Sequence, residues 1–358
     1  MQAEFDFQNL PPVKLNHLRL LTDSTGMLQH ATHSVVNYKS GYTTDDNARA
    51  LAAVLKYHAL FNSMDSETLA MIYLGFLYYM QQPDGTFHNN VSFERKFLEE
   101  ETGWDCFGRV LWACGYAVYS KLYENAKATA KKMFDEAMPS LGKLEDCRPV
   151  AFAIIGLHYY YSAKPGQTDL KEKIIFLGEK LLSMLAKNSS GDWLWFEQEL
   201  TYCNARMPHA LFLAYLSTKD KRFLEAAERS FAFLESKTIK GGMFMPVGQK
   251  GWFPKGCSKA LFDQQPIEAS AMVDAAVEAF KATGKEKYRK TAVVSFEWFL
   301  GRNSLQARVY DDTNGGCFDG LTETEPNRNQ GAESTIAYLL ARLAIEEVAR
   351  MGQTSLNR

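Results

Sequence analysis

Helical periodicity recurs along this chain in pairs of segments, and this repeat restricts the fold more than any other feature of the sequence. Apolar residues spaced three and four apart begin near residue 44 and continue almost to the C-terminus. One period of about 60 residues holds two helices and a loop with glycine and an aromatic residue. The pattern predicts helices over residues 13–21, 48–57, 67–80, 105–122, 126–137, 150–161, 170–185, 205–216, 223–234, 267–282, 288–300 and 330–350.

Alternate helices of this series begin with polar or charged motifs. These motifs lie at residues 43–49, 103–109, 145–149, 201–206, 265–270 and 330–335. The last two align position by position, so that Glu268 and Glu333 correspond and lie 65 residues apart. The intervening helices are followed by the glycine and aromatic loops, at residues 83–87, 191–197, 241–244 and 315–320.

A chain of such hairpins can close into a ring, with one helix of each pair inside and the other outside. We therefore predict an all-α (α/α)6 toroid, a double ring of about twelve helices. It would form one domain over residues 1–358, with residues 1–40 as an N-terminal segment that closes the ring. The inner helices would run parallel, and their polar N-termini would surround a single funnel at which backbone N–H groups and helix dipoles point.

These motifs make the chain resemble the six-hairpin glycosidase superfamily, over residues 15–349. Residues 21–31 and 41–51, the second of which begins Gly41-Tyr42-Thr43-Thr44-Asp45, are similar to bacterial proteins described as glycosidase-like. Some of those proteins are joined to glycosyltransferase domains. The resemblance implies an oligosaccharide or glycoside as ligand. It leaves the reaction open, because this fold hosts hydrolases, phosphorylases, lyases and epimerases.

The acids in the first turns of the inner helices are the candidates for chemistry. Glycoside hydrolysis uses two carboxyl groups across the bond, one as acid and one as base or nucleophile. We predict that the catalytic pair comes from Asp46, Asp105, Glu268 and Glu333. The alternative is structural: Thr43 with Asp46 and Thr102 with Asp105 fit capping boxes, and an acid in a first turn stabilises the helix dipole.

The other polar residues of the motifs are expected to bind sugar hydroxyls, and loop aromatics to stack on the C–H faces of sugar rings, although core packing is the simpler role for an aromatic residue. The predicted substrate-binding residues are His33, Asp45, Arg49, Arg109, Asp146, Arg148, Trp195, Asn204, Arg206, His209, Trp252, Gln265, Asp319 and Gln330.

Two other functions fit the same pattern. A sugar 2-epimerase-like isomerase would need a base and an acid on either side of the second carbon, and His33 and His209 would supply them. A non-catalytic sugar-binding or glycosyltransferase-accessory module would use the acids only as caps and hydrogen-bonding groups.

The composition argues against two classes of binding partner, nucleic acid and a membrane. The chain has 40 basic and 42 acidic residues and no basic tract, so we expect no nucleic acid. It has no apolar run of the roughly 20 residues that span a bilayer. The first residues lack the features of a secretory signal, which favours the cytoplasm, although a trimmed signal peptide would leave the same sequence.

The six cysteines include no CxxC pair, so we expect reduced thiols, no metal site and no cofactor. Cys106, Cys147 and Cys203 lie near N-termini of inner helices, where the pKa of a thiol falls. Convergence of the three thiols on a metal or a nucleophilic site is one interpretation, and buried packing residues are the other.

Overall fold

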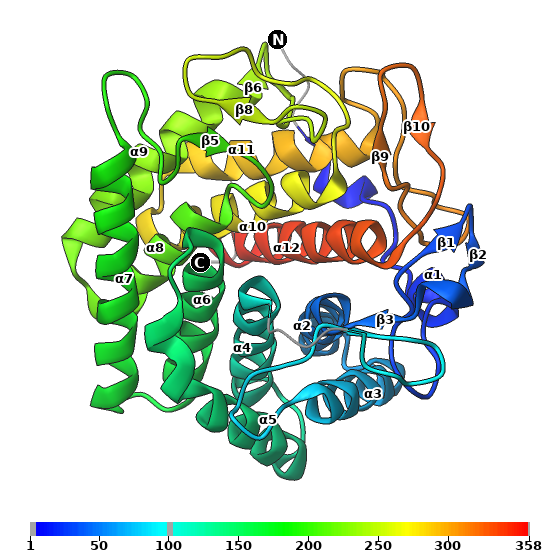
Figure 1. Cartoon of the computed structure of the whole chain (residues 1–358). Helices are drawn as coiled ribbons and strands as arrows, with labels where there is room; N and C mark the ends of the chain where they lie inside the picture. The colour runs from blue at the N-terminus through cyan, green and yellow to red at the C-terminus, as the bar shows by residue number, and fades with distance from the viewer. Residues whose placement is uncertain (1–4, 99–102, 357–358) are drawn as a thin grey trace.

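The computed structural model of the protein describes residues 5–98 and 103–356, and 59% of the chain is helical (Figure 1). Each predicted helix is present, with ends that shift by a few residues. Thr102, from the second predicted capping box, lies outside the described residues. The α-helices are α1 (Asn16–Leu20), α2 (Thr44–Phe61), α3 (Met64–Met80), α4 (Trp104–Tyr119), α5 (Glu124–Ala137), α6 (Cys147–Ala163), α7 (Thr168–Asn188), α8 (Arg206–Thr218), α9 (Lys221–Thr238), α10 (Pro266–Thr283), α11 (Glu286–Glu297) and α12 (Ala332–Leu356).

The even-numbered helices form a closed inner ring. Each of them packs against the next, from α2 through α4, α6, α8 and α10 to α12, and α12 packs back against α2. Helices α3, α5, α7, α9 and α11 each pack on the outer side of the even-numbered helix before them, and Figure 1 shows α3, α5, α7 and α11 at the periphery. The predicted double ring of about twelve helices is thereby confirmed.

The twelfth helix is shorter than predicted. Helix α1 spans five residues and contacts α12, at the place where a sixth outer helix would complete the double ring. The preceding Pro11-Pro12 pair disfavours helical backbone in that stretch. After Leu21 the chain turns back on itself, and Thr22 pairs with Met27 in an isolated antiparallel bridge.

Helices α4 and α6 approach each other closely because glycines line their contact. A Cβ atom at Gly115 would collide with the backbone of Gly156, and one at Gly156 would collide with the backbone of Leu111. Gly108 lies in the same way against the backbone of Pro149. The absence of side chains at these three positions lets the two inner helices pack backbone to backbone.

Short strands and 3-10 helices occupy the connections. The five antiparallel strand pairs are β1 (Ala31–Thr32) with β2 (Val35–Val36), β3 (Tyr42–Thr43) with β4 (Asn90–Val91), β5 (Glu199–Leu200) with β8 (Phe253–Pro254), β6 (Ile239–Lys240) with β7 (Met243–Phe244), and β9 (Gly320–Leu321) with β10 (Pro326–Asn327). The 3-10 helices are η1 (Phe7–Asn9), η2 (Tyr38–Ser40), η3 (Met138–Lys143) and η4 (Trp298–Leu300).

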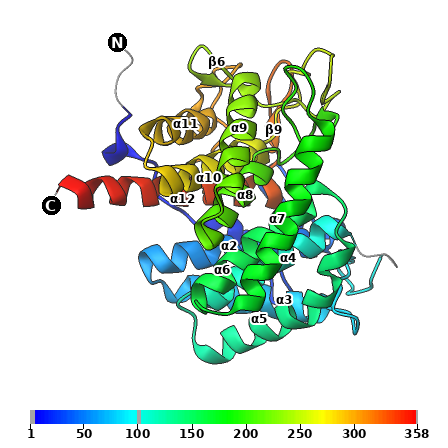
Figure 2. The same cartoon turned by 90° about the vertical axis from the view of Figure 1, so that its left-hand side faces the viewer.

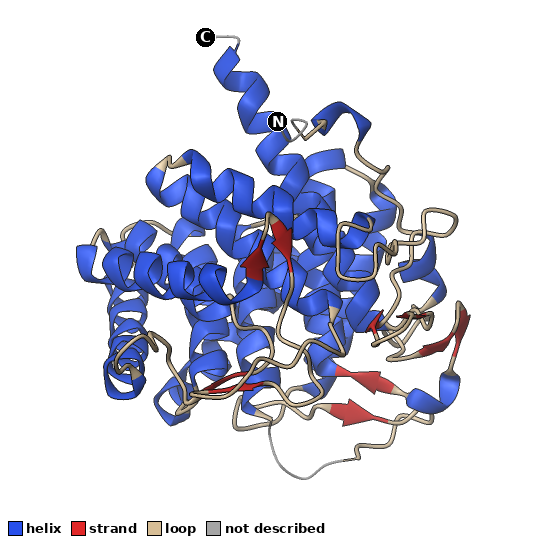
Figure 3. Cartoon of the chain, turned by 90° about the horizontal axis from the view of Figure 1, so that it is seen from above, coloured by secondary structure: helices blue, strands red, loops and turns tan. Residues whose placement is uncertain are grey.

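The two faces of the ring differ. Most of the short strands gather on the side away from the C-terminal end of α12 (Figure 3). This end of α12 projects from the body of the molecule (Figures 2 and 3). No helix in the described part of the chain combines the length and the apolar character needed to cross a membrane.

Candidate active site at the N-termini of the inner helices

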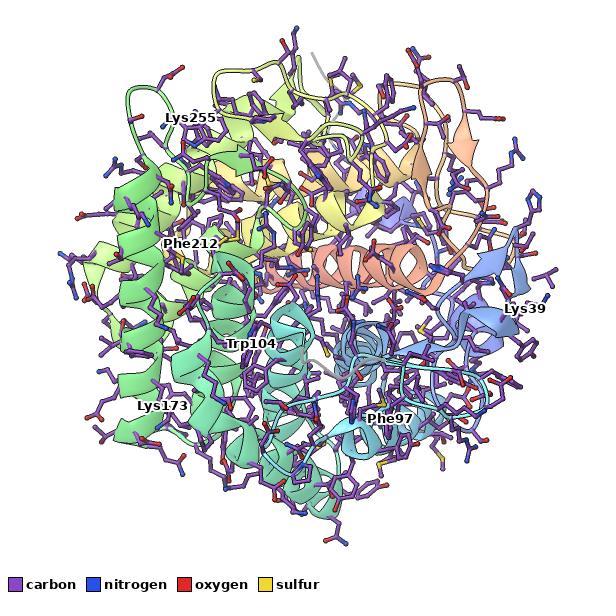
Figure 4. All side chains as sticks on the ribbon, in the orientation of Figure 1. Lys39, Phe97, Trp104, Lys173, Phe212 and Lys255 are labelled. Carbon is purple, nitrogen blue, oxygen red and sulfur yellow. The ribbon has the colours of Figure 1, made fainter. Side chains whose placement is uncertain are left out.

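Side chains from the polar motifs meet at one face of the ring. Arg49 of α2 donates to Glu333 of α12 at 2.9 Å. Arg109 of α4 forms an ion pair with Asp45 of α2, with 2.9 Å between Nε and Oδ1. These contacts join residues far apart in the sequence, and they require the N-termini of α2, α4 and α12 to lie together, as the repeat predicts. In Figure 4, Trp104 at the start of α4 lies near the middle of the molecule, whereas Lys39 and Lys173 lie at its edge.

Local capping determines where α2 begins. The hydroxyl of Thr43 accepts a hydrogen bond from the backbone N–H of Asp46 at 3.0 Å and donates to the Asp46 carboxyl at 2.7 Å. The capping role that was the structural alternative for Asp46 is therefore present. Strand β3 precedes this cap, and its pairing with β4 places Asn90 opposite Thr43.

An acidic pocket of about 290 Å³ opens beside this cap, between the N-termini of α2 and α12. We define it by its four carboxylate residues, Asp45, Asp46, Asp319 and Glu333. The side chain of Glu333 is 42% exposed, whereas that of Asp46 is only 4% exposed. The remaining lining residues are Gln29, His30, Thr43, Arg49, Asn89, Asn90, Gln265, Gly331 and Ser334.

Arg49 organises the charges of this pocket. Its guanidinium lies 2.8 Å from Asp46, 2.9 Å from Glu333 and 3.5 Å from Asp45. Burial raises the pKa of Asp46 to about 6, although Arg49 opposes the shift, and the charges of Asp45 and Glu333 add to it. Burial opposes the charge on Arg49, but its three carboxylate neighbours raise its pKa above the ordinary value. The pocket therefore holds one carboxyl that takes up a proton near pH 6 and others closer to solvent.

Asp319 belongs to the last of the glycine and aromatic loops and is held at the start of α12. One of its carboxylate oxygens accepts from the backbone N–H of Gly331 at 2.8 Å and from the hydroxyl of Ser334 at 2.6 Å. Gln265, at the N-cap of α10, also lines the pocket. The structure thus brings Asp45, Arg49, Gln265 and Asp319 from the predicted binding set to the pocket, together with the predicted catalytic residues Asp46 and Glu333.

The other two predicted catalytic acids lie beside the pocket and not in its lining. Asp105 accepts from the hydroxyl of Tyr202 at 2.6 Å and pairs with Arg109 at 3.5 Å. Glu268 is buried, accepts from the side-chain amide of Asn204 at 2.8 Å, and has a second oxygen without a hydrogen-bond partner in the described chain. Burial raises the pKa of Glu268 to about 7.

Two predicted binding residues, Trp195 and Gln330, are buried within the fold and do not line the pocket. Trp195 is fully buried and packs against Phe196 and Phe233, so the expectation that it stacks on sugars at the rim is wrong. Gln330 is also buried, donates to Asp311 at 2.9 Å and accepts from Asn314 at 2.8 Å, because the Gly315-Gly316 turn folds over it.

The two predicted histidines do not come together. His33 is exposed in the β1–β2 hairpin with a φ of 52°, and its backbone contacts Asn329 and Gln330. His209 is buried next to Arg206, and burial, reinforced by the charge of Arg206, holds its pKa well below the usual value. The pocket contains His30 instead.

The predicted binding residues at the start of α6, and Trp252 in a later loop, do not line the pocket. Asp146 is exposed at the N-cap of α6 and makes no side-chain cap bond. Arg148 is buried and bonds to Glu197 at 2.9 Å and to the carbonyl of Tyr202 at 2.7 Å. Trp252 is half-buried beside Tyr202, with ring centroids 6.3 Å apart.

Arginines meet beneath the acidic pocket on the axis of the ring. Arg49, Arg109 and Arg206 line a small cavity there with Trp112 and Cys203. Arg206 lies over Trp112 at 4.9 Å from the ring centroid and donates to Asp274 at 2.8 Å.

A position near a helix N-terminus was expected to lower the thiol pKa of three cysteines, and the structure shows the opposite shift for Cys203. Cys106, Cys147 and Cys203 are buried, and burial raises the pKa of Cys203 to about 11. Loss of hydration outweighs the charge of the neighbouring Arg109, which acts to lower the pKa of Cys203. Within residues 5–98 and 103–356, no three His, Cys, Asp or Glu side chains gather in a group that could hold a metal ion.

Sequence reasoning missed several polar residues of the pocket, Gln29 among them, and one residue below it. His30, Asn89, Asn90 and Ser334 line the pocket, and the Asn pair stands two residues after the Gly85-Thr86-Phe87 loop, which was the available signal. Asp274 binds Arg206 and Lys56 in the core. Its isolated charge inside an Ala and Val run of α10 was the corresponding signal.

No protein-family model and no curated protein matches the sequence. The structure, in contrast, is similar to cellobiose 2-epimerase from Bacillus thermoamylovorans, with a TM-score of 0.73, 13% identity, and coverage of 94% of this chain and 96% of that one. A D-mannose isomerase gives a TM-score of 0.71 at 12% identity, covering 93% and 96%. A GH76 α-mannanase from Bacteroides thetaiotaomicron gives 0.64 at 13% identity, covering 87% and 88%.

The chain has the (α/α)6 toroid fold. The likeness extends over almost the whole of this chain and of these two neighbours. In this toroid the acidic pocket lies at the N-termini of the inner helices, between the first and the last of them.

Proposed function

We propose that this toroid is a carbohydrate-active enzyme that hydrolyses a glycosidic bond in the acidic pocket. One observation carries the proposal: Arg49 holds Asp46 and Glu333, from the first and last inner helices, at the same cavity. Because both carboxylates bond to one guanidinium, their bonded oxygens are at most about 8 Å apart. Glycosidase carboxyl pairs are separated by roughly 5 to 9.5 Å.

The two carboxyls differ in the way that hydrolysis needs. Asp46 is buried and its pKa is raised to about 6, so it can hold a proton and donate it to the leaving oxygen. Glu333 is the more exposed and is paired with Arg49, so we assign it the role of base toward water or of nucleophile toward the sugar. Asp45, Asp319 and the Asn89-Asn90 pair would accept from or donate to the sugar hydroxyls.

The neighbours support an oligosaccharide as the substrate. One of them is an inactive variant of an α-1,6-mannanase from Salegentibacter, in complex with α-1,6-mannotriose, with a TM-score of 0.61 and 13% identity over 92% of this chain and 95% of that one. Two consecutive aspartates of that enzyme are replaced by asparagine. The acidic pocket here also contains two consecutive aspartates, Asp45 and Asp46.

An isomerase is the second candidate, because His30 lines the pocket and two neighbours are a sugar isomerase and a sugar epimerase. Its acid–base pair would be His30 with Glu333, in place of the expected pair of histidines. The pocket supplies a single histidine among its described lining residues, and four carboxylates, which is why we favour hydrolysis.

Incubation of the purified protein with α-1,6-mannotriose and with cellobiose tests the proposal, with products separated by chromatography. Shorter sugars indicate hydrolysis, and a sugar of unchanged length but altered identity indicates the isomerase. Binding without turnover indicates the sugar-binding module, and either of the last two results overturns the hydrolase.

Amide variants then test the roles. Glu333→Gln should lower kcat by roughly 100-fold or more with little change in melting temperature. Glu124→Gln is the matched control, because Glu124 is also a first-turn acid but lies on the outer helix α5, with its side chain 88% exposed. If Glu333→Gln and Asp46→Asn both melt lower and retain near wild-type turnover, these acids are caps.

A further inference from the structure

A second cavity, of about 550 Å³, lies at the other end of the inner ring. All six inner helices line it, through residues in their C-terminal halves, such as Tyr119 of α4, Tyr159 of α6 and Glu347 of α12. Since the acidic pocket lies at the N-termini of α2 and α12, the two cavities open on opposite faces. The second is on the side toward which the end of α12 projects in Figure 2.

Three tyrosines form one wall of this cavity, which we call the tyrosine cavity after Tyr116, Tyr119 and Tyr159. Ring centroids of Tyr116 and Tyr159 are 4.6 Å apart with the rings edge to face, and those of Tyr119 and Tyr159 are 5.6 Å apart. None of their hydroxyls hydrogen-bonds to another group within the described residues. Tyr119 is 50% exposed, so part of its side chain is accessible to a ligand.

Charged side chains form the facing edge, and each is ion-paired: Glu278 and Glu347 with Lys281, and Arg350 with Glu346, which is not in the lining. Lys281 donates to Glu278 at 2.8 Å and to Glu347 at 2.9 Å. Each carboxylate uses one oxygen in these bonds, and the second remains an acceptor. With Arg350, the lining holds two acidic and two basic side chains. Burial lowers the pKa of His158 to about 4, so this residue adds no charge near pH 7.

The cavity therefore offers an aromatic face, hydroxyls that both donate and accept, free carboxylate oxygens and no net side-chain charge. Sugar rings present C–H faces for stacking and hydroxyls around their edge, and they carry no charge. We propose that the tyrosine cavity is a second binding site, for a neutral saccharide unit. Its volume lies in the range of small-ligand sites, and the proposal does not depend on hydrolysis in the acidic pocket.

Binding here is expected without cleavage. Lys281 bridges the two carboxylates, and although burial opposes it, the charge of Lys281 lowers the pKa of Glu347, so Glu347 is no proton donor to a glycosidic oxygen. The site would hold a sugar chain on the face opposite the acidic pocket.

Titration calorimetry of the full chain with cellobiose and with α-1,6-mannotriose, together with crystals soaked in each, tests this assignment. We expect at least one of the sugars to bind at two sites, with density against Tyr119 and Tyr159. Tyr119→Ala should weaken the second site at least tenfold and leave the first unchanged. Tyr159→Phe, which keeps the ring and removes one hydroxyl, should weaken it several-fold and guards against a folding defect.

Tyr123→Ala is the control, because Tyr123 is 48% exposed and lies outside the cavity. Equal two-site binding by wild type and both cavity variants would refute the assignment. So would sugar density in soaked crystals without binding in solution, or binding of spermidine in the cavity while both sugars are excluded.

Discussion

Arg49 donates to Glu333 across 284 residues of sequence and to Asp46 within its own helix, at 2.9 and 2.8 Å. It thereby joins the first inner helix to the last, at the seam where the ring closes. The same contact holds the two carboxyls that we assign to catalysis. One side chain therefore takes part both in ring closure and in the electrostatics of the pocket.

Replacement of Arg49 should destabilise the protein in a pH-dependent way. Arg49→Met leaves Asp46 buried without a counter-ion, a change that costs about 3–5 kcal/mol of unfolding free energy at neutral pH. Loss of the cation raises the pKa of Asp46 further, so protonation relieves the cost at pH 5. Urea denaturation at both pH values measures this. Arg222→Met, which removes an ion pair of a 59% exposed side chain, should cost under about 1 kcal/mol at either pH.

Glu268 should make stability fall as pH rises. Burial raises its folded-state pKa from 4.5 to about 7, so the native state binds the proton more tightly than the unfolded state. Its contribution is complete below pH 4.5 and is lost as pH rises through 7, by about 3 kcal/mol in all. We expect Glu268→Gln to gain about 2.5 kcal/mol relative to wild type between pH 5 and pH 8, because part of the effect is already lost at pH 5, as measured by denaturation. A difference that is constant with pH would contradict the raised pKa.

Glycine substitutions should separate close helix packing from helix propensity. Gly115→Ala places a Cβ atom against the backbone of Gly156 and should lower the unfolding free energy by about 1–3 kcal/mol or more. Gly75→Ala lies within α3 with no other atom within 4 Å of the added carbon, so it should stabilise by about 0.5–1 kcal/mol. Thermal unfolding of the two variants gives the comparison, and equal shifts would refute the close approach of α4 and α6.

Two loop tryptophans should respond in opposite ways. Trp195→Ala removes a fully buried ring and should cost about 3–5 kcal/mol of stability. Trp252→Ala removes a half-buried ring beside Tyr202 and should leave the melting temperature within a few degrees of wild type. If Trp252 contributes a sugar contact, the substitution should raise the KM for an oligosaccharide, whereas kcat changes little. An unchanged KM would leave Trp252 outside the binding surface.

Local pattern determined most of the fold. The helix spans follow from apolar residues three and four apart, and the start of α2 follows from a cap between Thr43 and Asp46, which are three residues apart. The parallel inner helices also predicted that the polar N-termini would surround one funnel, but of the four predicted catalytic acids only Asp46 and Glu333 line the pocket. Such features depend on interactions within a helix or on the period of the repeat, and both are visible in a single sequence.

Tertiary packing alone decided which polar residues face the pocket. His209 and Trp195 stand in motifs like those of the site residues, yet both are buried. His30 and Asn90 reach the pocket through loop paths that no local signal specifies. Successive side chains along a helix point about 100° apart around its axis, so a shift of one residue changes which side chain faces the pocket. The tilt of each inner helix depends on contacts such as that of Gly115 with Gly156. These contacts join residues distant in sequence, so the direction of each side chain follows from the closed ring and not from the motif that contains it.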